Sequence, residues 1–472
     1  MSKNVFSLNA KAENRLTNYS YISGYAGAFI IIVLGYSVAK ANILSQGWEI
    51  FSYKVADNYL HSAFLVLGVC GFAMFVIELI IRGMVEKRII VISDKILQKK
   101  NGLFLLECFL NYIIELGILA LAILFYKYAN EYGFIRHNNY YQPWFNLMNI
   151  FWKGYLYFGL PYILLTRSLQ HDAEADKKEP AYLFFKAVMF ILRKTPLFSL
   201  SEKTEFLDFD KDGNFFSFTR QDKTNLLGIF VKMFFIPVIT VFFADQFFHL
   251  VNNWSYITNT LSKDFWSRFM SALDSHNITF SIIFSVDVGL AWCGYVISSR
   301  WIKNSNVSTE PTFLGWFVAI SCYPPFQWNM SSYFSPPADN AYLSIPNSDL
   351  VWLFTVMSTF SYMVYVLATV YFGLRFSNLT HRGIITRGPY SFIRHPAYAA
   401  KNFSWWCVML PVILYQGLIQ HQSFVFVQIF GLIFMTFFYY WRAITEERHL
   451  SLDPDYVEYC KKVKHRFIPG IC

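Results

Sequence analysis

Apolar residues occur along this chain in long runs that short polar segments separate. A helix needs about 20 residues to cross the hydrocarbon core of a bilayer, and most of the runs are about that long. They lack the alternation of apolar and polar residues that is typical of barrel strands. Because a backbone in lipid must satisfy its own hydrogen bonds, the runs predict membrane-spanning helices. We place about ten, at residues 19–40, 61–83, 103–127, 144–166, 224–250, 278–300, 312–327, 350–374, 402–418 and 422–441.

Two of these runs have an alternative interpretation. The seventh run is short and contains Pro324 and Pro325, so a re-entrant segment is also compatible with it. The first run follows Lys3, Lys11 and Arg15 in the manner of a signal peptide, but its length favours a retained span.

The composition supports an all-α, polytopic membrane bundle, since 55% of the residues are hydrophobic, 20% are aromatic and 15% are charged. A net charge of +9 is also typical of nucleic-acid-binding proteins. Here, however, the basic residues lie in short clusters between apolar runs, so we expect the lipid bilayer and no nucleic acid as partner. The seven cysteines are scattered, which favours packing roles over a disulfide framework or a metal site.

Basic residues also predict the topology. The loop after the first run holds only Lys54, whereas the loop after the second run holds five basic residues between Lys87 and Lys100. Loops after later runs follow the same alternation. By the positive-inside rule, both termini are expected in the cytoplasm.

The chain divides into an N-terminal multi-span region, residues 1–374, and a C-terminal membrane core, residues 375–472. The N-terminal region contains a cytoplasmic loop at 167–223, in which an apolar patch at 181–192 is suited to lie on the membrane surface. The segment DFDKDGN, residues 208–214, begins like a calcium loop, but its twelfth position is Thr219 instead of glutamate. A hairpin that turns at Asp212 and Gly213 is therefore favoured over a calcium site.

Charged residues inside apolar runs are costly and are candidates for function. Glu115 and Asp287 lie midway along the third and sixth runs. They would line an ion path in a transporter, but hydroxyl or amide groups of neighbouring helices are the more common partners. Glu78 and Lys232, at similar depth, are suited to pair with each other.

The polar residues of the C-terminal core fall into two segments, GPYSFIRHPAY at 388–398 and RAITEERHL at 442–450. The short turn at 416–422 predicts that the ninth and tenth runs form an antiparallel hairpin. That hairpin would bring Arg394 to Tyr398 beside Arg442 to Glu447. Pro396 is suited to the first position of a helix, and Arg442 and Glu446 share a helix face.

These residue types suit a cofactor that carries a carboxylate, an amine, a ribose and a sulfonium. Cationic side chains would bind the carboxylate, acids the amine and hydroxyls, and aromatic faces the sulfonium and adenine. Methyl transfer from a sulfonium is an in-line displacement that depends on positioning and desolvation. An interfacial anchor of basic and aromatic residues is the alternative without chemistry.

Together with YxxY, a basic stretch and a final Ile-Pro, these motifs resemble the C-terminal catalytic core of the isoprenylcysteine carboxyl methyltransferase and phospholipid methyltransferase family of integral-membrane enzymes. The resemblance covers about residues 375–470. It implies S-adenosylmethionine as cofactor and a lipophilic methyl acceptor at the cytoplasmic face, such as the carboxylate of a prenylated cysteine. It also implies a catalytic role for Arg442, which would orient the acceptor, and for Glu446. The cofactor would be bound by Gly388, Tyr390, Arg394, His395, Pro396, Tyr398, Glu446 and Glu447.

The chain departs from the family in two respects. The first seven runs have no counterpart in many members, and Asp453-Pro454-Asp455 replaces the usual Phe-Gly before YxxY. Membrane sterol reductases, which use NADPH, have a similar tail with an element like Tyr459-Cys460. Their Gly-Trp-Trp-Gly loop is absent here, and the acid pair of the tenth run suits a methyltransferase better. A reductase and a non-enzymatic transporter remain the alternative functions.

Overall fold

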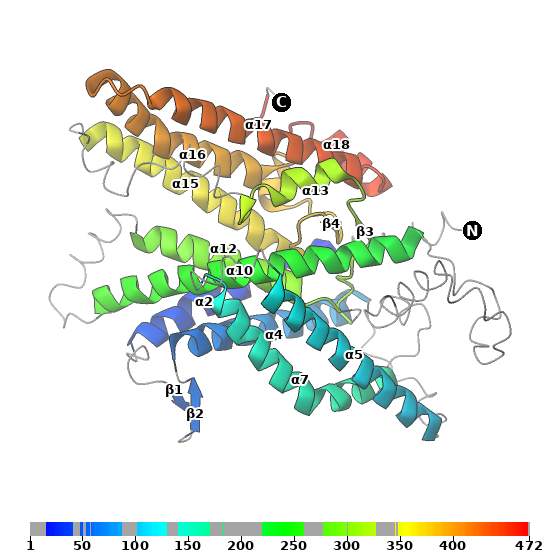
Figure 1. Ribbon diagram of the computed structural model, residues 1–472. Helices are drawn as coiled ribbons and strands as arrows, with labels where there is room; N and C mark the ends of the chain where they lie inside the picture. Colours follow the sequence, from blue (N-terminus) through cyan, green and yellow to red (C-terminus); the bar gives the residue numbers. More distant parts are fainter. Residues whose placement is uncertain are drawn as a thin grey trace. The chain divides into compact units, whose positions relative to one another are not determined.

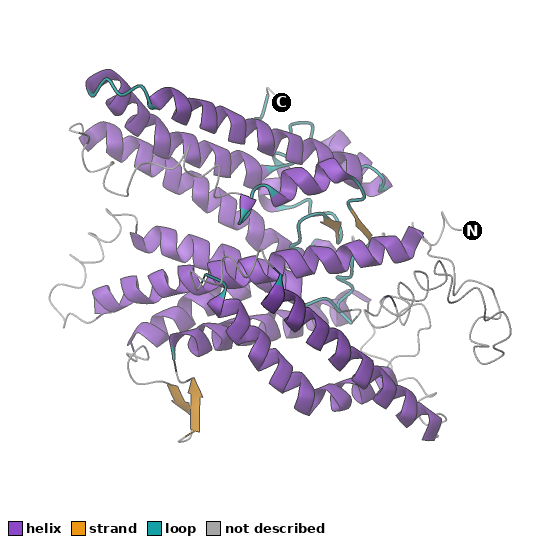
Figure 2. Ribbon diagram, viewed as in Figure 1, coloured by secondary structure: helices purple, strands orange, loops and turns teal. Residues whose placement is uncertain are grey.

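The computed structural model describes residues 16–40, 48–50, 53–56, 58–86, 102–129, 140–169, 183, 220–258, 277–299, 301–326, 345 and 348–470. These residues are mainly helical, as Figures 1 and 2 show. They fall into two compact units. The first comprises Met1–Glu86 and Phe235–Cys472, and the second comprises Lys87–Phe234. The patch at 181–192, apart from Leu183, and the DFDKDGN segment lie outside the described residues.

Three of the described helices lie wholly or partly in the second unit. They are α5 (Gly102–Tyr128), α7 (Gln142–Leu169) and the first part of α10 (Arg220–Thr258), which continues into the first unit from Phe235. The side chain of Glu115 on α5 accepts a hydrogen bond from the Tyr155 hydroxyl on α7. The hydroxyl of Tyr112 donates to the Leu156 carbonyl oxygen over 2.7 Å. A hydroxyl of a neighbouring helix therefore satisfies Glu115, which is the more common arrangement for an acid inside an apolar run.

The first unit contains the other described helices and two small antiparallel sheets. Its long helices are α2 (Ser20–Lys40), α4 (Tyr59–Glu86), α12 (Asn277–Val296), α15 (Ser348–Phe372), α16 (Pro396–Leu414) and α17 (Val425–Leu450). Its short helices are α13 (Phe313–Ile320) and α18 (Pro454–Lys462). Strands β1 (Trp48–Ile50) and β2 (Tyr53–Ala56) form a hairpin, and β3 (Ser308–Thr309) pairs with β4 (Thr380–His381).

Eight of the described helices are long and apolar enough to cross a membrane: α2, α4, α5, α10, α12, α15, α16 and α17. Large apolar side chains such as Phe72, Phe426 and Phe430 are exposed on them, each to more than 60%. A solvent-exposed surface of that kind would aggregate, so lipid is the medium that it fits. The protein is therefore a multi-pass helical membrane bundle.

The seventh predicted span differs from expectation. Its helix, α13, has 8 residues and is roughly 12 Å long, too short to cross a hydrocarbon core of about 30 Å. The helix ends at Ile320, four residues before Pro324, which lacks the amide hydrogen that would bond to the Ile320 carbonyl oxygen in a continued helix. The fourth predicted span, α7, is a helix of 28 residues with Pro161 in its interior and is not one of the eight.

An ion pair at the end of α15 connects the N-terminal helices to the C-terminal core. Arg375 Nη1 lies 3.1 Å from Glu78 Oε2 and donates to the Ser20 hydroxyl over 2.8 Å, and all three side chains are buried. Glu78, for which the sequence suggests Lys232, thus has Arg375 as its partner. α2 also packs closely against α15 at Gly24. A Cβ atom at this position would lie 1.9 Å from the Val370 carbonyl oxygen, so only glycine allows the two backbones to approach this far.

Helices α15, α16 and α17 lie side by side, in yellow to red in Figure 1. The π-helical segment η4 (Tyr415–Ile419) continues α16, and a short turn then leads into α17, so these two helices form the expected hairpin. The pairing of β3 with β4 ties the segment after α12 to the segment after α15. The loop 376–395 is therefore held between α15, α16 and α17, where the polar residues of the C-terminal core gather.

Candidate functional site

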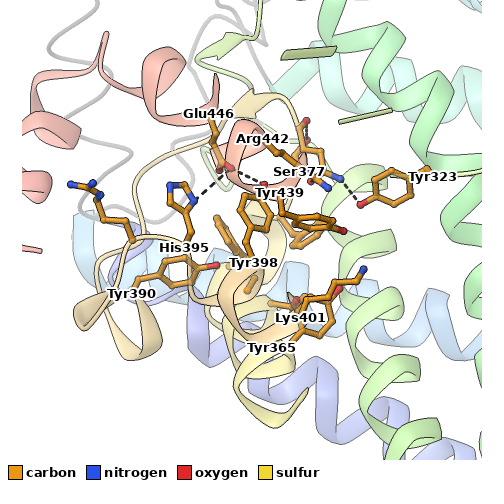
Figure 3. A pocket seen from close by; sticks show the side chains of 16 residues that line it. Tyr323, Tyr365, Ser377, Tyr390, His395, Tyr398, Lys401, Tyr439, Arg442 and Glu446 are labelled. Carbon is orange, nitrogen blue, oxygen red and sulfur yellow. Dashed lines mark hydrogen bonds and ion pairs between the residues drawn. The ribbon is translucent and has the colours of Figure 1, made fainter. Parts of the chain in front are cut away.

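A pocket opens among these three helices, with about 680 Å³ of empty space including the part that is open to solvent. Ten of the side chains that line it are labelled in Figure 3. They come from the turn after α13, from α15, from the segments at 376–378 and 390–395, from α16 and from α17. The lining residues are Tyr323, Tyr365, Thr369, Phe372, Phe376, Ser377, Asn378, Tyr390, Arg394, His395, Ala397, Tyr398, Lys401, Tyr439, Arg442 and Glu446.

Six of the residues that the resemblance selects line this one pocket. They are Tyr390, Arg394, His395, Tyr398, Arg442 and Glu446. The two polar segments of the C-terminal core, which are about 50 residues apart in the sequence, are therefore brought together by the hairpin of α16 and α17. Gly388, Pro396 and Glu447 do not line the pocket.

Gly388 and Pro396 shape the loop between α15 and α16. Gly388 has φ of +62°, and a Cβ atom there would lie 2.3 Å from the ring of Tyr371, so both its backbone and its surroundings require glycine. Pro396 is the first residue of α16, where the missing amide hydrogen is not needed. Between them, the turn η3 (Gly388–Ser391) buries Tyr390. These two residues therefore set the backbone course of the loop.

The C-terminal tail holds the same loop from its other side. The backbone N–H groups of Arg394 and His395 donate to the carbonyl oxygens of His465 and Arg466, each over 3.0 Å. The hydroxyl of Tyr459 donates to the Tyr390 carbonyl oxygen over 2.7 Å. Burial raises the pKa of Tyr459 and that of Tyr390, so both phenols are neutral hydrogen-bond donors at physiological pH.

The departure at 453–455 has a structural explanation. The Asp453 side chain caps α18, accepting from the Asp455 N–H over 2.9 Å, and Pro454 takes the first helical position. His381 Nε2 lies 2.8 Å from the second carboxylate oxygen of Asp453, and both side chains are buried. The tail is therefore positioned by an N-cap and by a contact to the loop before the pocket.

Glu447 is the centre of a group of charged side chains that we call the Glu447 clamp. Its carboxylate lies 2.9 Å from Arg394 Nε and 3.1 Å from His395 Nε2. Arg466 Nη2 donates to it over 2.7 Å, and this hydrogen bond raises the pKa of Arg466. The clamp joins α17, the loop and the tail, and it leaves Glu447 with little capacity for a ligand.

Glu446, the neighbouring residue, has different surroundings. Its side chain is 38% exposed, against 13% for Glu447. The Tyr398 hydroxyl donates to it over 2.7 Å, and His395 Nδ1 lies 3.9 Å away (Figure 3). His395 also stacks on Tyr398, with ring centroids 5.4 Å apart. Glu446 therefore keeps an open carboxylate at the pocket, next to two parallel rings.

Arg442 is buried among aromatic rings. Its guanidinium carbon lies 5.1 Å from the ring centroid of Tyr398, 5.5 Å from that of Tyr439 and 5.7 Å from that of Tyr323. Its Nη2 atom donates to Asn378 Oδ1 over 2.6 Å. Among the described residues, no acidic side chain forms an ion pair with it. Aromatic faces hold the cation, and they leave most of its donors available to an anion.

Several lining residues were not selected from the sequence. Tyr365, Thr369 and Lys401 form one part of the wall, and Asp287 on α12 lies behind it. The Tyr365 and Thr369 hydroxyls donate to the two oxygens of Asp287 over 2.7 and 2.5 Å. Their spacing of four residues on α15 is a detectable signal, because such residues share a helix face. Asp287 was noted in the sequence, but its neighbours on α15 were not.

Comparison of the chain with protein-family models, with curated proteins and with solved structures finds no match. The resemblance to the methyltransferase family therefore rests on the motifs of the C-terminal core alone. Within the described ranges, no group of His, Cys, Asp and Glu side chains is arranged to hold a metal ion.

Proposed function

We propose that this protein is an integral-membrane methyltransferase that uses S-adenosylmethionine and acts on a lipophilic acceptor at the cytoplasmic face. The observation that carries the proposal is the combination of side chains in one pocket. An open carboxylate, stacked aromatic rings and a buried cation that has no ion-pair partner among the described residues meet where two sequence-distant segments converge.

The residues present fit the cofactor group by group. Glu446 is suited to bind an amine or the hydroxyls of a ribose, because its carboxylate has open acceptor positions. The rings of His395, Tyr398 and Tyr390 offer faces for adenine and for a sulfonium. Glu447, by contrast, would act through Arg394 and His395, which it orients.

Bound S-adenosylmethionine would supply an activated methyl group, and methyl transfer then needs alignment and exclusion of water. Arg442 is suited to hold an anionic acceptor in line, because its cation is already desolvated and its donors face the pocket. A carboxylate acceptor is a nucleophile at neutral pH and needs no base. A prenylated cysteine or a similar acidic lipid is therefore the acceptor that we favour.

We propose that both termini lie at the membrane face that carries the site. The start of α2 and the end of α17 both lie at the end of the bundle that carries the loop 376–395.

Calorimetric titration of the detergent-purified protein tests the proposal. We expect saturable binding of S-adenosylhomocysteine and none of NADPH. Glu446→Ala and His395→Ala should each weaken the binding by at least tenfold. Glu458→Ala is a matched control, because this exposed acid pairs with Lys462 on α18, outside the pocket.

Three results would change the assignment. Saturable NADPH binding would favour the reductase, and binding of neither molecule would reduce the C-terminal motifs to an interfacial anchor. S-adenosylhomocysteine binding that the His395 and Glu446 variants leave unchanged would move the cofactor to another site.

A further inference from the structure

The wall of the pocket formed by α15 and α16 carries a second cation, Lys401, that the motifs do not account for. Its ammonium lies 5.5 Å from the ring centroid of Tyr365 and 5.4 Å from that of Trp405. It is half-buried and lines the pocket. In Figure 3 Lys401 lies beside Tyr365, away from the group of His395 and Glu446.

The position of Lys401 along its helix is costly. Lys401 follows Pro396 by five residues, which places its Cα atom roughly 7 Å along α16. α16 is one of the helices apolar enough to cross a membrane. A lysine at this depth needs compensation, and within the described part of the chain no acidic side chain forms an ion pair with it. Two aromatic faces provide part of that compensation.

Asp287 of α12 supports this wall from behind. The hydroxyls of Tyr365 and Thr369 donate to its two oxygens, and Asp287 itself does not line the pocket. Asp287 thus fixes the Tyr365 ring that lies beside the Lys401 ammonium. Within the described residues no hydrogen bond to the ammonium is present, so its N–H groups are available to a partner in the pocket.

We propose that Lys401 is a specificity-determining residue that binds the anionic group, a carboxylate or a phosphate, on the polar head of the acceptor. Asp287 is a positioning residue that acts on Lys401 through Tyr365. This inference rests on the proposed function, because it divides the same pocket into a cofactor part at Glu446 and an acceptor part at Lys401. It also assigns a role to α12, a helix of the N-terminal region that the resemblance leaves unexplained.

A lysine at this depth could instead reach the membrane surface and bind lipid phosphates unselectively. Two observations favour the pocket. Lys401 is a lining residue, and it is held over the ring of Tyr365, which lines the same pocket. A snorkelling lysine would direct its ammonium away from both.

Photo-crosslinking in detergent tests the inference with three amphiphiles that share one diazirine-bearing hexadecyl chain. The probes are a carboxylate, a phosphate monoester and a neutral alcohol, and mass spectrometry counts separately the crosslinks to peptides that line the pocket and those to other peptides. We expect both anionic probes to outcompete the alcohol in the wild-type protein. Lys401→Gln should raise the concentration at which each anionic probe half-saturates the crosslinking by about tenfold, which is the effect of losing one charge-assisted hydrogen bond.

Two control variants make the result specific. Lys401→Arg retains a cation and should restore binding to within about threefold, whereas Lys464→Gln, at an exposed position of the tail, should have no effect. The stronger of the two anionic probes then identifies carboxylate or phosphate as the group recognised. Titration of the wild-type protein with S-adenosylhomocysteine tests the proposed function independently.

The inference is overturned if the wild-type pocket does not prefer anionic probes to the alcohol, a comparison that needs no variant. It is also overturned if Lys401→Gln weakens all three probes equally, because the lysine would then only maintain the wall. A loss of anionic crosslinks confined to peptides outside the pocket would assign Lys401 to the membrane surface.

Discussion

The Glu447 clamp and the two cations of the pocket, Arg442 and Lys401, use charge in opposite ways. In the clamp, the Glu447 carboxylate faces the side chains of Arg394, His395 and Arg466. In the pocket, both cations lie over aromatic rings and neither forms an ion pair among the described residues. Paired charges hold chain segments together, whereas cations over rings remain available to an anion.

The difference has a physical cause. The attraction in an ion pair offsets the cost of desolvating its two charges only when the geometry is good and additional hydrogen bonds form. The N–H donors of the cation are then occupied by the carboxylate. A cation over an aromatic face gains about 0.5 to 2 kcal/mol from the ring and still points its N–H groups elsewhere. The comparison therefore separates residues that build the site from residues that would bind in it.

The largest effect is expected from breaking the clamp. Glu447→Gln leaves Arg394, His395 and Arg466 near an uncharged amide, and removing one partner of a buried ion pair typically costs about 3 kcal/mol. We expect the free energy of unfolding, measured by chemical denaturation in detergent, to fall by about that amount. Glu446→Gln should change it by less than about 0.5 kcal/mol, since that side chain is partly exposed.

The opposite order would contradict the comparison. If Glu446→Gln destabilised the protein more than Glu447→Gln, then Glu446 would be the structural acid and Glu447 the candidate for ligand binding.

An intermediate effect is expected from the loop that the clamp holds. Gly388→Ala must place a Cβ atom against the Tyr371 ring at a positive φ, which costs about 1 to 2 kcal/mol. Unfolding should be easier, and S-adenosylhomocysteine should bind more weakly because the loop carries Tyr390 and His395. Gly68→Ala on α4 is the matched control, because its Cβ atom would meet nothing within 4 Å. Equal effects in the two variants would show that the loop tolerates displacement.

The smallest effect is expected at Tyr398, which lies between the Glu447 clamp and the cations of the pocket. Tyr398→Phe removes the hydroxyl that donates to Glu446 and keeps the ring that faces Arg442 and His395. One neutral donor to an exposed acid is worth about 1 kcal/mol, so we expect the affinity for S-adenosylhomocysteine to fall about fivefold. Tyr440→Phe, on the same hairpin, should leave it unchanged. A loss above a hundredfold would mean that the hydroxyl itself contacts the ligand.

Much of the fold was predictable because hydropathy is a local property. The long apolar runs predicted where the long helices lie, although α10 and α17 continue 8 and 9 residues beyond their predicted ends at 250 and 441, and α16 begins 6 residues before 402. The short turn at 416–422 predicted that α16 and α17 form a hairpin. The seventh span was wrong in length because two prolines end α13. The predicted partner of Glu78 was wrong as well, since the depth of a residue along its helix does not specify which neighbouring helix its side chain faces.

The sequence by itself determined that this chain belongs in a membrane and that its polar residues gather at the end of one helical hairpin, because both follow from residue type and spacing. Only the tertiary structure decided that Glu447 is enclosed by Arg394, His395 and Arg466 while Glu446, one residue earlier, is open. Successive residues point about 100° apart on a helix, so two adjacent acids meet different neighbours. Likewise, Asp287 reaches the pocket wall only because α12 packs on α15, a contact between residues 82 positions apart.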